Sequence, residues 1–349
     1  MRALTVEPGK RDSVRLEEVA EPSPSDGGIL VQTLALGVCG TDREILSGIY
    51  GSPPVGQQRL VLGHESLGRV LDAPRDAGFA PDDLVVGIVR RPDPVPCPAC
   101  AVGEWDMCLN GRYSECGIKD RHGFGSERFR IETEFTVKIE EALGSLGVLV
   151  EPASIVAKAW DHVERVTQRL ANWRPRTLLV TGAGPIGLLA ALMGAQRGLE
   201  IYVLDSPYQP TKAQLVQDLG GTYEAELGAF ESLQPDVLME CTGAPALISE
   251  LLARTGPAGI LCLLGVSPPD RNFELDIGNI CRTMVLDNHT IIGSVNANRR
   301  HYEMGAQALA QADRDWLCRL ISRRVPLTQW AEGMRHYPND IKVVLEFPG

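Results

Sequence analysis

Four cysteines crowd into one short stretch of the chain, CPACAVGEWDMCLNGRYSEC, which begins at residue 97. The first two are separated by two residues, a third follows after seven residues, and the fourth after seven more. Four thiolates in one excursion are typical of a closed tetrahedral zinc site, which would hold a long loop that has little core of its own. Four reduced thiols in a loop are the alternative. We therefore predict a structural zinc bound by Cys97, Cys100, Cys108 and Cys116.

A second metal site can be assembled from single residues that lie earlier in the chain. Cys39 in GVCGTD and His64 in LGHES each follow a strand-like run, and each has a glycine neighbour. A catalytic zinc takes three protein ligands and leaves one position for substrate. Taken singly, Cys39 is equally well a small buried thiol, and His64 a hydrogen-bonded core residue.

Glu65 directly follows His64 within VLGHESLGRV, a run that predicts a β-strand over 61–70. Neighbours on a regular strand point to opposite faces, so the two side chains should not reach one atom. Gly63 allows the chain to bend, and this bend can release His64 from the alternation. Glu65 then either ligates the zinc during part of the cycle or tunes the metal from beside it, and we favour the second role.

A glycine-rich loop, TGAGPIG, places Gly182, Gly184 and Gly187 directly after a strand-like run and at the start of a helical one. The first glycine permits the turn, the second lets a pyrophosphate approach the backbone, and the third lets the helix pack on the strand. Asp205 ends the second strand, about twenty residues further on, where a carboxylate meets the ribose hydroxyls of a dinucleotide. The residues that follow it, SPYQP, contain no Lys or Arg to balance a 2′-phosphate, so we predict NAD over NADP.

Composition excludes several classes of partner. The formal net charge of −11 argues against nucleic acid and anionic membranes, because both need concentrated Lys and Arg. The first residues, MRALTVEPGK, lack a continuous apolar segment, and the most apolar region is interrupted by Gly and Pro. We therefore expect a cytoplasmic protein. Four further cysteines lie in apolar runs and are expected in the core, namely Cys241, Cys262, Cys281 and Cys318.

The 349 residues are long for one core and suggest two domains. Up to about Glu151, short strand-like runs alternate with turns, which indicates a β-rich domain. From Arg176 the pattern changes to strand, helix, strand, as in TLLVTG, PIGLLAALMGAQRG and EIYVLDS. This alternation predicts an α/β fold with a doubly wound parallel sheet. The tail, which is helical and then strand-like in DIKVVLEF, fits either domain by composition.

The motifs GVCGTD, GHE, the cysteine loop and TGAGPIG occur in an order and at separations that resemble the zinc-containing medium-chain dehydrogenases. Within that superfamily the chain is most similar to the archaeal-type glucose (aldose) 1-dehydrogenases. The closer likeness lies in GTDREI, VRRP, YSECGIKDRHGFGSE, EPASIVAKA and GSVNANRRHYE. The resemblance implies a GroES-like catalytic domain over 1–157, a Rossmann domain over 158–304, and a segment over 305–349 that returns to the catalytic domain. It also implies dimers or tetramers joined through the nucleotide domain.

The same resemblance implies a reaction: oxidation of a sugar at C1 to the lactone, with zinc and with hydride transfer to NAD. It places the catalytic zinc on Cys39, His64 and Glu151, with Glu65 beside them. Thr41 would relay the proton, although a hydroxyl that merely caps a turn is an equal alternative. The implied sugar contacts are Thr41, Glu115, Glu151 and Asn296. The implied cofactor contacts are Gly182, Gly184, Pro185, Ile186, Gly187, Asp205, Ser206, Thr242, Leu264, Gly265, Val266 and Asn296.

The sequence departs from the family pattern in two places. Glucose enzymes with this pattern commonly carry basic residues after the second nucleotide strand and accept NADP, whereas this chain has Asp205 and SPYQP. Relatives with a full structural zinc have C-x₂-C-x₂-C-x₇-C, but Pro94 stands where the first cysteine would be, so Cys116 must replace it. Two alternative functions stay open. The first is a dehydrogenase of another polyol, cyclitol or alcohol, and the second is a zinc-free cofactor-binding protein.

Overall fold

The computed structural model describes residues 1–252, 254–267 and 275–348, and it divides the chain into two compact units. Unit 1 comprises Met1–Ser154 and Asn296–Gly349, and unit 2 comprises Ile155–Val295. The tail therefore belongs to the same unit as the N-terminal part of the chain. The second boundary lies nine positions before the expected one at 304, because Asn296 bonds to Glu115 and Asn298 to Asp106, both within unit 1.

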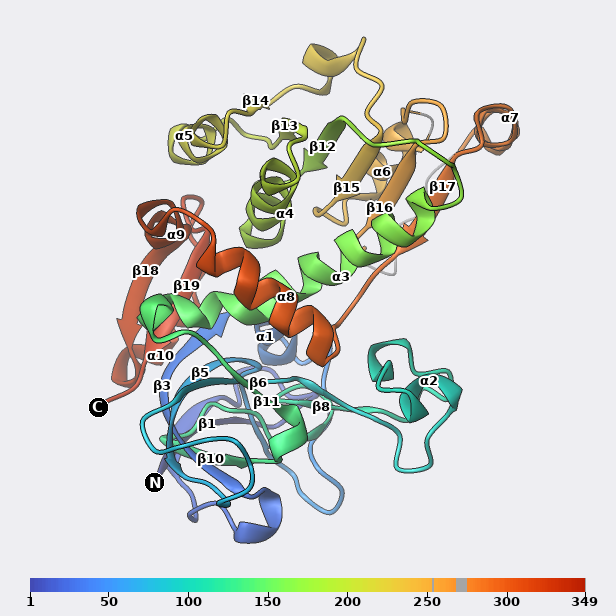
Figure 1. Cartoon of the computed structure of the whole chain (residues 1–349). Helices are drawn as coiled ribbons and strands as arrows, with labels where there is room; N and C mark the ends of the chain where they lie inside the picture. The colour runs from blue at the N-terminus through green and yellow to red at the C-terminus, as the bar shows by residue number, and fades with distance from the viewer. Residues whose placement is uncertain (253, 268–274, 349) are drawn as a thin grey trace. The chain divides into compact units, whose positions relative to one another are not determined.

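The main sheet of unit 1 has seven strands in the order β11-β6-β5-β3-β19-β18, with β10 paired to β3 (Figure 1). The pairs formed by β3 with β5, β10 and β19 are antiparallel. Buried and partly exposed residues alternate over the first six residues of β3, as a strand with one buried face requires, and the last four residues are all buried. The strands are β3 (Ile29–Val38), β5 (Glu65–Asp72), β6 (Leu84–Gly87), β10 (Arg128–Ile131), β11 (Thr136–Lys138), β18 (Ile321–Pro326) and β19 (Lys342–Glu346).

Unit 1 also contains two small sheets, β2-β1-β4 and β7-β8-β9, and several short helices. The strands are β1 (Arg2–Val6), β2 (Arg15–Glu18), β4 (Leu60–Val61), β7 (Arg90–Arg91), β8 (Ser114–Cys116) and β9 (Asp120–Arg121). The α-helices are α1 (Gly40–Leu46), α2 (Pro98–Ala101), α8 (Arg299–Ala310), α9 (Arg314–Leu320) and α10 (Trp330–Met334). The 3₁₀ helices are η1 (Pro24–Asp26), η2 (Trp105–Met107), η3 (Thr133–Phe135), η4 (Glu141–Leu149) and η6 (Leu327–Gln329).

Unit 2 is built on a six-stranded sheet in the order β14-β13-β12-β15-β16-β17, in which every pair is parallel. This order is that of a doubly wound dinucleotide-binding sheet, so the predicted α/β class is confirmed. The strands are β12 (Thr177–Thr181), β13 (Glu200–Leu204), β14 (Thr222–Glu224), β15 (Val237–Glu240), β16 (Ile260–Leu263) and β17 (Thr290–Gly293). The helices are α4 (Pro185–Gln196), α5 (Pro210–Asp218), η5 (Leu227–Phe230), α6 (Pro245–Leu251) and α7 (Ile277–Asp287).

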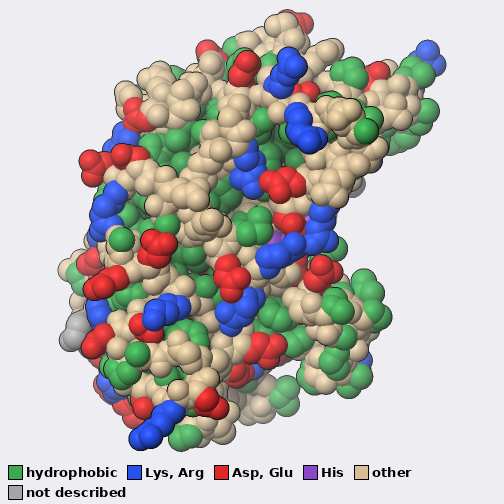
Figure 2. Space-filling view, viewed as in Figure 1, with side chains coloured by type: hydrophobic (Ala, Val, Ile, Leu, Met, Phe, Trp, Pro, Cys, Tyr) green, Lys and Arg blue, Asp and Glu red, His purple; other side chains and the backbone are tan. Residues whose placement is uncertain are grey.

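The helix α3 (Val150–Thr167) has no counterpart in the predicted elements. The segment Glu141–Thr167 is long and apolar enough to cross a membrane by length and composition alone, but 78% of its apolar window is buried inside the folded chain. Val156, Trp160 and Val163 are all at most 1% exposed, as in the core helix of a globular unit. Figure 2 shows basic and acidic side chains intermingled on the face that it presents.

Candidate active site

Cys39 directly follows β3 and caps the N-terminus of α1, so its sulphur is held at the junction of a strand and a helix. The Cys39 Sγ accepts a hydrogen bond from the Thr41 N–H (3.3 Å), and the Cys39 N–H donates to Asp42 Oδ2 (2.9 Å). His64 Nε2 lies 3.0 Å from Cys39 Sγ. The structure therefore brings together the two single residues that the sequence suggested as metal ligands.

Asp42 fixes the other side of the His64 ring. Its Oδ1 lies 3.4 Å from His64 Nδ1, and both side chains are buried. Burial alone would lower the pKa of His64, but the negative charges of Cys39 and Asp42 outweigh burial and raise this pKa well above 6.5. A carboxylate on one ring nitrogen of a metal-binding histidine orients the ring and fixes its tautomer. Sequence reasoning missed Asp42, although its place three residues after Cys39 was a usable signal.

The predicted strand over 61–70 is interrupted at His64. β4 ends at Val61 and β5 begins at Glu65, with Gly63 at φ +93° between them. The bend expected at Gly63 is therefore present, and the two-faced alternation does not apply to His64.

Glu65 belongs to β5 and is held by a lysine from the far end of the chain. Both of its carboxylate oxygens lie 2.6 Å from Lys342 Nζ, and the Lys342 ammonium also donates to Val38 O (3.3 Å). Gly37 lies opposite Glu65 in the sheet, and a Cβ at position 37 would fall 2.0 Å from Glu65 Oε2. Only a glycine leaves room for the Glu65 carboxylate there.

Glu151 lies in the first turn of α3 and is only 8% exposed. Burial first, and then the negative charge of Glu65, raise the pKa of Glu151 to about 7. The charges of His64 and Lys342 act in the opposite direction, so Glu151 belongs to the same buried group of charges.

The residues present fit a zinc ion. Ligand atoms of Cys39, His64 and Glu65 all lie within 4.8 Å of one another, and the donor set of thiolate, imidazole and carboxylate is one that zinc accepts. Because both oxygens of Glu65 contact Lys342, Glu65 is the least available ligand of the three. The Glu151 carboxyl is influenced by the charges of this group, but it is not among the ligand atoms that lie within 4.8 Å of one another.

The expected sugar contacts Glu115 and Asn296 are in direct contact with each other. Asn296 Nδ2 donates to Glu115 Oε1 (2.7 Å), although 181 positions separate them in the sequence. Both side chains are buried, and Arg90 also donates to Glu115 Oε1 from Nε and Nη2. Thr41 lies in the first turn of α1, where its N–H is taken by Cys39 Sγ.

The glycine-rich loop of unit 2 has the geometry that a dinucleotide requires. Gly182 has φ +90°, and a Cβ at Gly187 would lie 1.7 Å from Gly182 O, so both positions need glycine. A Cβ at Gly184 would meet nothing within 4 Å, which leaves space for a ligand over that backbone. Pro185 and Ile186 continue from Gly184 as the first residues of α4.

Asp205 follows β13 and contacts the glycine-rich loop directly, since its Oδ1 accepts from the Ala183 N–H (3.0 Å). Its Oδ2 accepts from Lys212 Nζ (2.8 Å) and from the Tyr223 hydroxyl (3.1 Å). The prediction from sequence considered only SPYQP, the five residues that follow Asp205, and overlooked Lys212, which lies seven positions after Asp205. Ser206, the next expected contact, is exposed.

Two further loops meet at the ends of β15 and β16. Glu240 is fully buried, and its carboxylate accepts from the Thr242 N–H (2.7 Å) and the Gly243 N–H (3.0 Å). A Cβ at Gly265 would lie 2.0 Å from Gly243 N, so this loop contacts the segment Leu264–Val266 closely. The expected cofactor residues Thr242, Leu264, Gly265 and Val266 thus cluster at one edge of the sheet. Sequence reasoning missed Glu240, which holds them.

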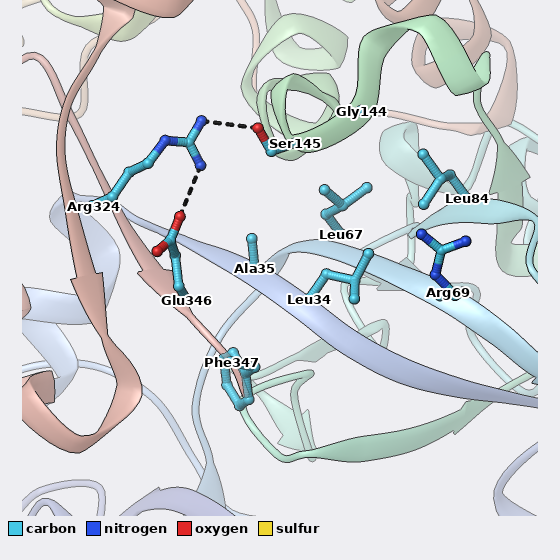
Figure 3. Close-up of a pocket in the computed structure, with 10 residues that line it drawn as sticks. All are labelled: Leu34, Ala35, Leu67, Arg69, Leu84, Gly144, Ser145, Arg324, Glu346 and Phe347. Atoms are coloured by element: carbon cyan, nitrogen blue, oxygen red, sulfur yellow. Dashed lines mark hydrogen bonds and ion pairs between the residues drawn. The ribbon is translucent and has the colours of Figure 1, made fainter. Parts of the chain in front are cut away.

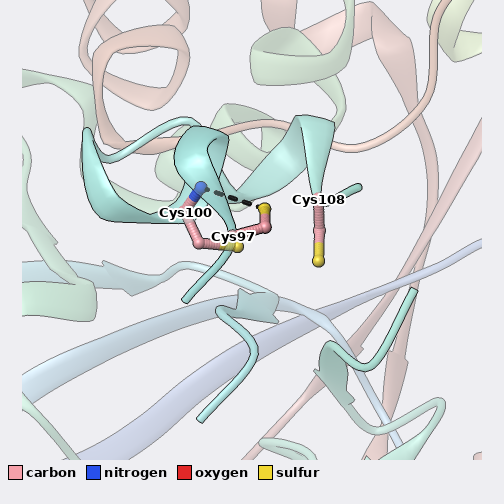
Figure 4. Close-up of side chains that lie close together, drawn as sticks. All are labelled: Cys97, Cys100 and Cys108. Atoms are coloured by element: carbon pink, nitrogen blue, oxygen red, sulfur yellow. Dashed lines mark hydrogen bonds between the residues drawn. The ribbon is translucent and has the colours of Figure 1, made fainter. Parts of the chain in front are cut away.

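The cysteine loop forms a group of three rather than four. Ligand atoms of Cys97, Cys100 and Cys108 lie within 4.8 Å of one another, and Figure 4 shows Cys97 and Cys100 at helix α2, with Cys108 on the segment that follows. Cys116 does not join this group, which corrects the four-cysteine prediction. It lies in β8, where its N–H donates to Val89 O (2.9 Å), so strand pairing holds it elsewhere.

The other cysteines also differ from expectation. Cys262 is buried and Cys241 is half-buried, but Cys281 and Cys318 are exposed. Cys281 and Cys318 lie on the exposed faces of α7 and α9, although each has an apolar residue beside it in the sequence.

A separate cavity of about 280 Å³ lies in unit 1 between β3, β5, η4 and the chain end. Figure 3 shows Arg324 crossing one side of it, where the guanidinium contacts Ser145 and Glu346. None of the expected site residues lines this cavity.

Comparison with known proteins identifies the family. Residues 25–141 match the family described as "Alcohol dehydrogenase GroES-like domain", and residues 144–347 match "Glucose dehydrogenase C-terminus". The second match covers more than half of the chain. The chain belongs to the glucose dehydrogenase family. It is thus a zinc-containing medium-chain dehydrogenase, as the motifs indicated, and an oxidoreductase of the NAD(P)-dependent kind.

Individual glucose dehydrogenases are similar over the whole length. The chain is 40% identical over 352 residues to "Glucose 1-dehydrogenase" of Thermoproteus tenax and 38% identical over 353 residues to "Glucose 1-dehydrogenase 2" of Vulcanisaeta moutnovskia, with 99% of each chain covered. Among solved structures, a Haloferax mediterranei glucose dehydrogenase "in complex with NADP, Zn and gluconolactone" superposes with a TM-score of 0.92 at 33% identity, covering 100% of both chains.

Proposed function

We propose that this protein oxidises the C1 hydroxyl of glucose or a related aldose to the lactone, with a nicotinamide dinucleotide as hydride acceptor. The observation that carries the proposal is the group of half-buried Cys39 with buried His64 and Glu65, whose ligand atoms lie within 4.8 Å of one another. It stands in a chain similar throughout to a glucose dehydrogenase whose described complex contains NADP, Zn and gluconolactone.

Cys39, His64 and Glu151 would hold the catalytic zinc, and Glu65 would stay beside it. Bound zinc would supply Lewis-acid activation of a hydroxyl, and the bound nicotinamide would accept the hydride. Glu65 is assigned the supporting role because the Lys342 ammonium neutralises both of its oxygens. Asp42 orients the His64 ring so that Nε2 faces Cys39.

Thr41 would move the proton and Glu115 and Asn296 would bind hydroxyls of the sugar. Thr41 stands two residues after Cys39, in the first turn of α1. Its hydroxyl is therefore close in sequence to a proposed ligand of the catalytic zinc. Glu115 and Asn296 are buried polar side chains in contact with each other. Every sugar oxygen that leaves water must regain a hydrogen bond, and buried groups of this kind can provide it.

Three of the cysteines would hold the second zinc. Cys97, Cys100 and Cys108 supply three thiolates, and a structural zinc is four-coordinate, so the fourth position would take a ligand other than cysteine. The carboxylate of Asp93, four residues before Cys97, is already engaged, because its oxygens accept from Val95, Asn110 and Arg112.

NAD is proposed as the preferred cofactor because the Asp205 carboxylate would repel a 2′-phosphate. The Lys212 ammonium offsets part of the negative charge of Asp205. The preference for NAD is attributed to the Asp205 carboxylate, so removal of its charge should weaken that preference. Replacement Asp205→Asn should raise kcat/KM for NADP relative to NAD by about tenfold or more, the equivalent of about 1.4 kcal/mol. A wild-type enzyme with higher kcat/KM for NADP would refute the preference.

We further propose that the protein assembles as a dimer or tetramer through unit 2. β17 is the last strand of the sheet, and α7, which precedes it in the chain, exposes Ile277, Val285 and Leu286. Light scattering of the purified protein should give about two or four times the mass of one chain. A monomer mass would refute this assembly.

The proposed reaction is tested by a screen that couples NAD reduction to aldoses, polyols and primary alcohols. Glucose or a close aldose should give the highest kcat/KM, and Cys39→Ser and His64→Ala should each abolish activity but leave NAD binding intact. Cys318→Ser, an exposed cysteine of α9, is the matched control and should remain active. Highest activity with a polyol or simple alcohol would favour the alternative substrates, and full activity of zinc-free Cys39→Ser would refute zinc chemistry.

A further inference from the structure

Arg90 is a buried arginine whose guanidinium is fixed on every side. It lies in β7 and is 5% exposed. Nε and Nη2 both donate to Glu115 Oε1, at 3.1 and 2.9 Å, and Nη1 donates to Asp106 O at 3.0 Å. The guanidinium carbon also lies 3.7 Å from the centre of the Tyr113 ring. A lysine cannot reproduce this combination of a planar fork and a stacked face.

The two oxygens of the Glu115 carboxylate differ in the hydrogen bonds that they accept. Its Oε1 accepts from Arg90 and also from Asn296 Nδ2 (2.7 Å). Asn296 is held in turn, since its backbone has φ +62° and its Oδ1 accepts from the Ala297 N–H (2.8 Å). Within the described residues, no hydrogen bond to Glu115 Oε2 is recorded. One oxygen is therefore saturated, whereas the other keeps its full capacity to accept.

We propose that Arg90 is a positioning residue that fixes Glu115 so that Oε2 accepts a hydrogen bond from one hydroxyl of the sugar. This inference rests on the proposed function, because it takes Glu115 to be a sugar contact. The Arg90 guanidinium has donors and no acceptor, so Glu115 faces it with a carboxylate oxygen that accepts. The ligand group opposite Oε2 must then be a donor, and a sugar that lacks this hydroxyl leaves a buried carboxylate oxygen unpaired.

The chain contains a matched control at the next position. Arg91 is also 5% exposed, it donates to the Glu132 carboxylate (3.0 Å), and its guanidinium carbon lies 4.1 Å from the centre of the Phe135 ring. Arg91 therefore resembles Arg90 in burial, in its carboxylate partner and in its aromatic partner. It differs in having no bond to Glu115 or Asn296 among the contacts described. A loss that comes only from disturbing a buried arginine should appear in both variants.

The experiment compares the zinc-loaded wild-type enzyme with Arg90→Lys, Arg91→Lys and Glu115→Gln. For each protein, kcat and KM are measured with glucose and with its 2-, 3-, 4- and 6-deoxy analogues. In the wild type, one deoxy sugar should lose between about tenfold and a hundredfold in kcat/KM, as expected for a hydrogen bond to a charged group. Arg90→Lys should raise KM for glucose with little change in kcat, and should reduce the penalty for that deoxy sugar to within about threefold. Arg91→Lys should keep the full penalty.

The outcomes separate this inference from the proposed function. If Glu115→Gln loses the penalty but Arg90→Lys keeps it, Arg90 does not position Glu115 and the inference is wrong. If no deoxy sugar is penalised in the wild type, or if Glu115→Gln keeps the penalty, the assignment of Glu115 as a sugar contact is itself wrong. Should Arg90→Lys not fold, Tyr113→Leu removes the ring that supports the guanidinium and should reduce the same penalty.

Discussion

Glu65 and Lys342 form a buried ion pair in which both carboxylate oxygens lie 2.6 Å from one ammonium nitrogen. Neither side chain is more than 3% exposed. The pair joins β5 to β19 next to the residues Cys39 and His64, so it ties the supporting carboxylate of the candidate zinc site to the last strand of the chain.

Removal of the lysine should leave the Glu65 charge uncompensated. We expect Lys342→Met to lower the free energy of unfolding by about 3–5 kcal/mol, and the double variant Lys342→Met with Glu65→Gln to recover most of this loss. Chemical denaturation of the wild type, both single variants and the double variant measures the coupling. Additive losses would show that the two side chains do not stabilise the protein as a pair.

The same variant should change the metal coordination. Once released from Lys342, Glu65 is free to approach zinc, so X-ray absorption of zinc-loaded Lys342→Met should show one more oxygen at about 2.0–2.2 Å. The wild type should lack this oxygen. A Glu65 ligand already present in the resting wild type would overturn the supporting role proposed for it.

Gly37 should tolerate no side chain, because a Cβ there would lie 2.0 Å from Glu65 Oε2. We expect Gly37→Ala to lower the free energy of unfolding by about 1–3 kcal/mol and to weaken zinc binding, since Glu65 must move. Gly40→Ala is the matched control, because nothing lies within 4 Å of a Cβ at position 40. Equal stability of the two variants would contradict the close packing of Gly37 on Glu65.

Counting zinc in purified variants tests the three-cysteine site. The wild type should contain about two zinc ions per chain, and Cys108→Ser about one. Cys116→Ser should retain about two, because its sulphur is outside the group of three. Loss of a zinc ion in Cys116→Ser would restore the four-cysteine arrangement predicted from the spacing.

The acid sensitivity of unit 1 should depend on Glu132, which binds Arg91 and Arg121. Burial opposes ionisation of this carboxyl, but the two guanidinium charges outweigh burial and hold its pKa below 4.5. A lowered pKa in the folded state stabilises the protein above the unfolded value, and the stabilisation disappears as the pH falls through the folded value. Melting temperatures of the wild type and Glu132→Gln should therefore differ at neutral pH and converge once the pH falls through the lowered pKa of Glu132, on the acid side of 4.5. Glu134→Gln, an exposed neighbour, should match the wild type throughout.

The strands and helices of unit 2 were accessible from sequence because their signals are local. The runs TLLVTG and EIYVLDS became β12 and β13, and TGAGPIG became the turn before α4. Helices α3 and α7 were missed. Most residues of α3 are buried, and its polar residues Glu151, Lys158 and Asp161 are among them, so the helix lacks the exposed polar face that marks a surface helix.

The candidate site was predictable only in part. Cys39 and His64 were suggested by their residue types, Glu115 and Asn296 were implied by the family resemblance, and the structure brings each pair together. Lys342, Arg90 and Glu240 were not named, because their partners lie far away in the sequence or are backbone groups of a loop. Cys116 was predicted as a zinc ligand because its spacing in the sequence is regular. Its position is instead determined by the pairing of β8 with β7.

The pairing of β19 with β3 has a consequence for the order in which the protein is made. Lys342 bonds to Val38, 304 positions earlier, whereas unit 2 is one continuous stretch of chain. On the ribosome, unit 2 can fold as soon as it emerges, but the main sheet of unit 1 must wait for its last strands. Until then Glu65 has no ammonium partner beside it. Loading of the catalytic zinc is thus expected to be a late event in biogenesis, after synthesis of the chain is complete.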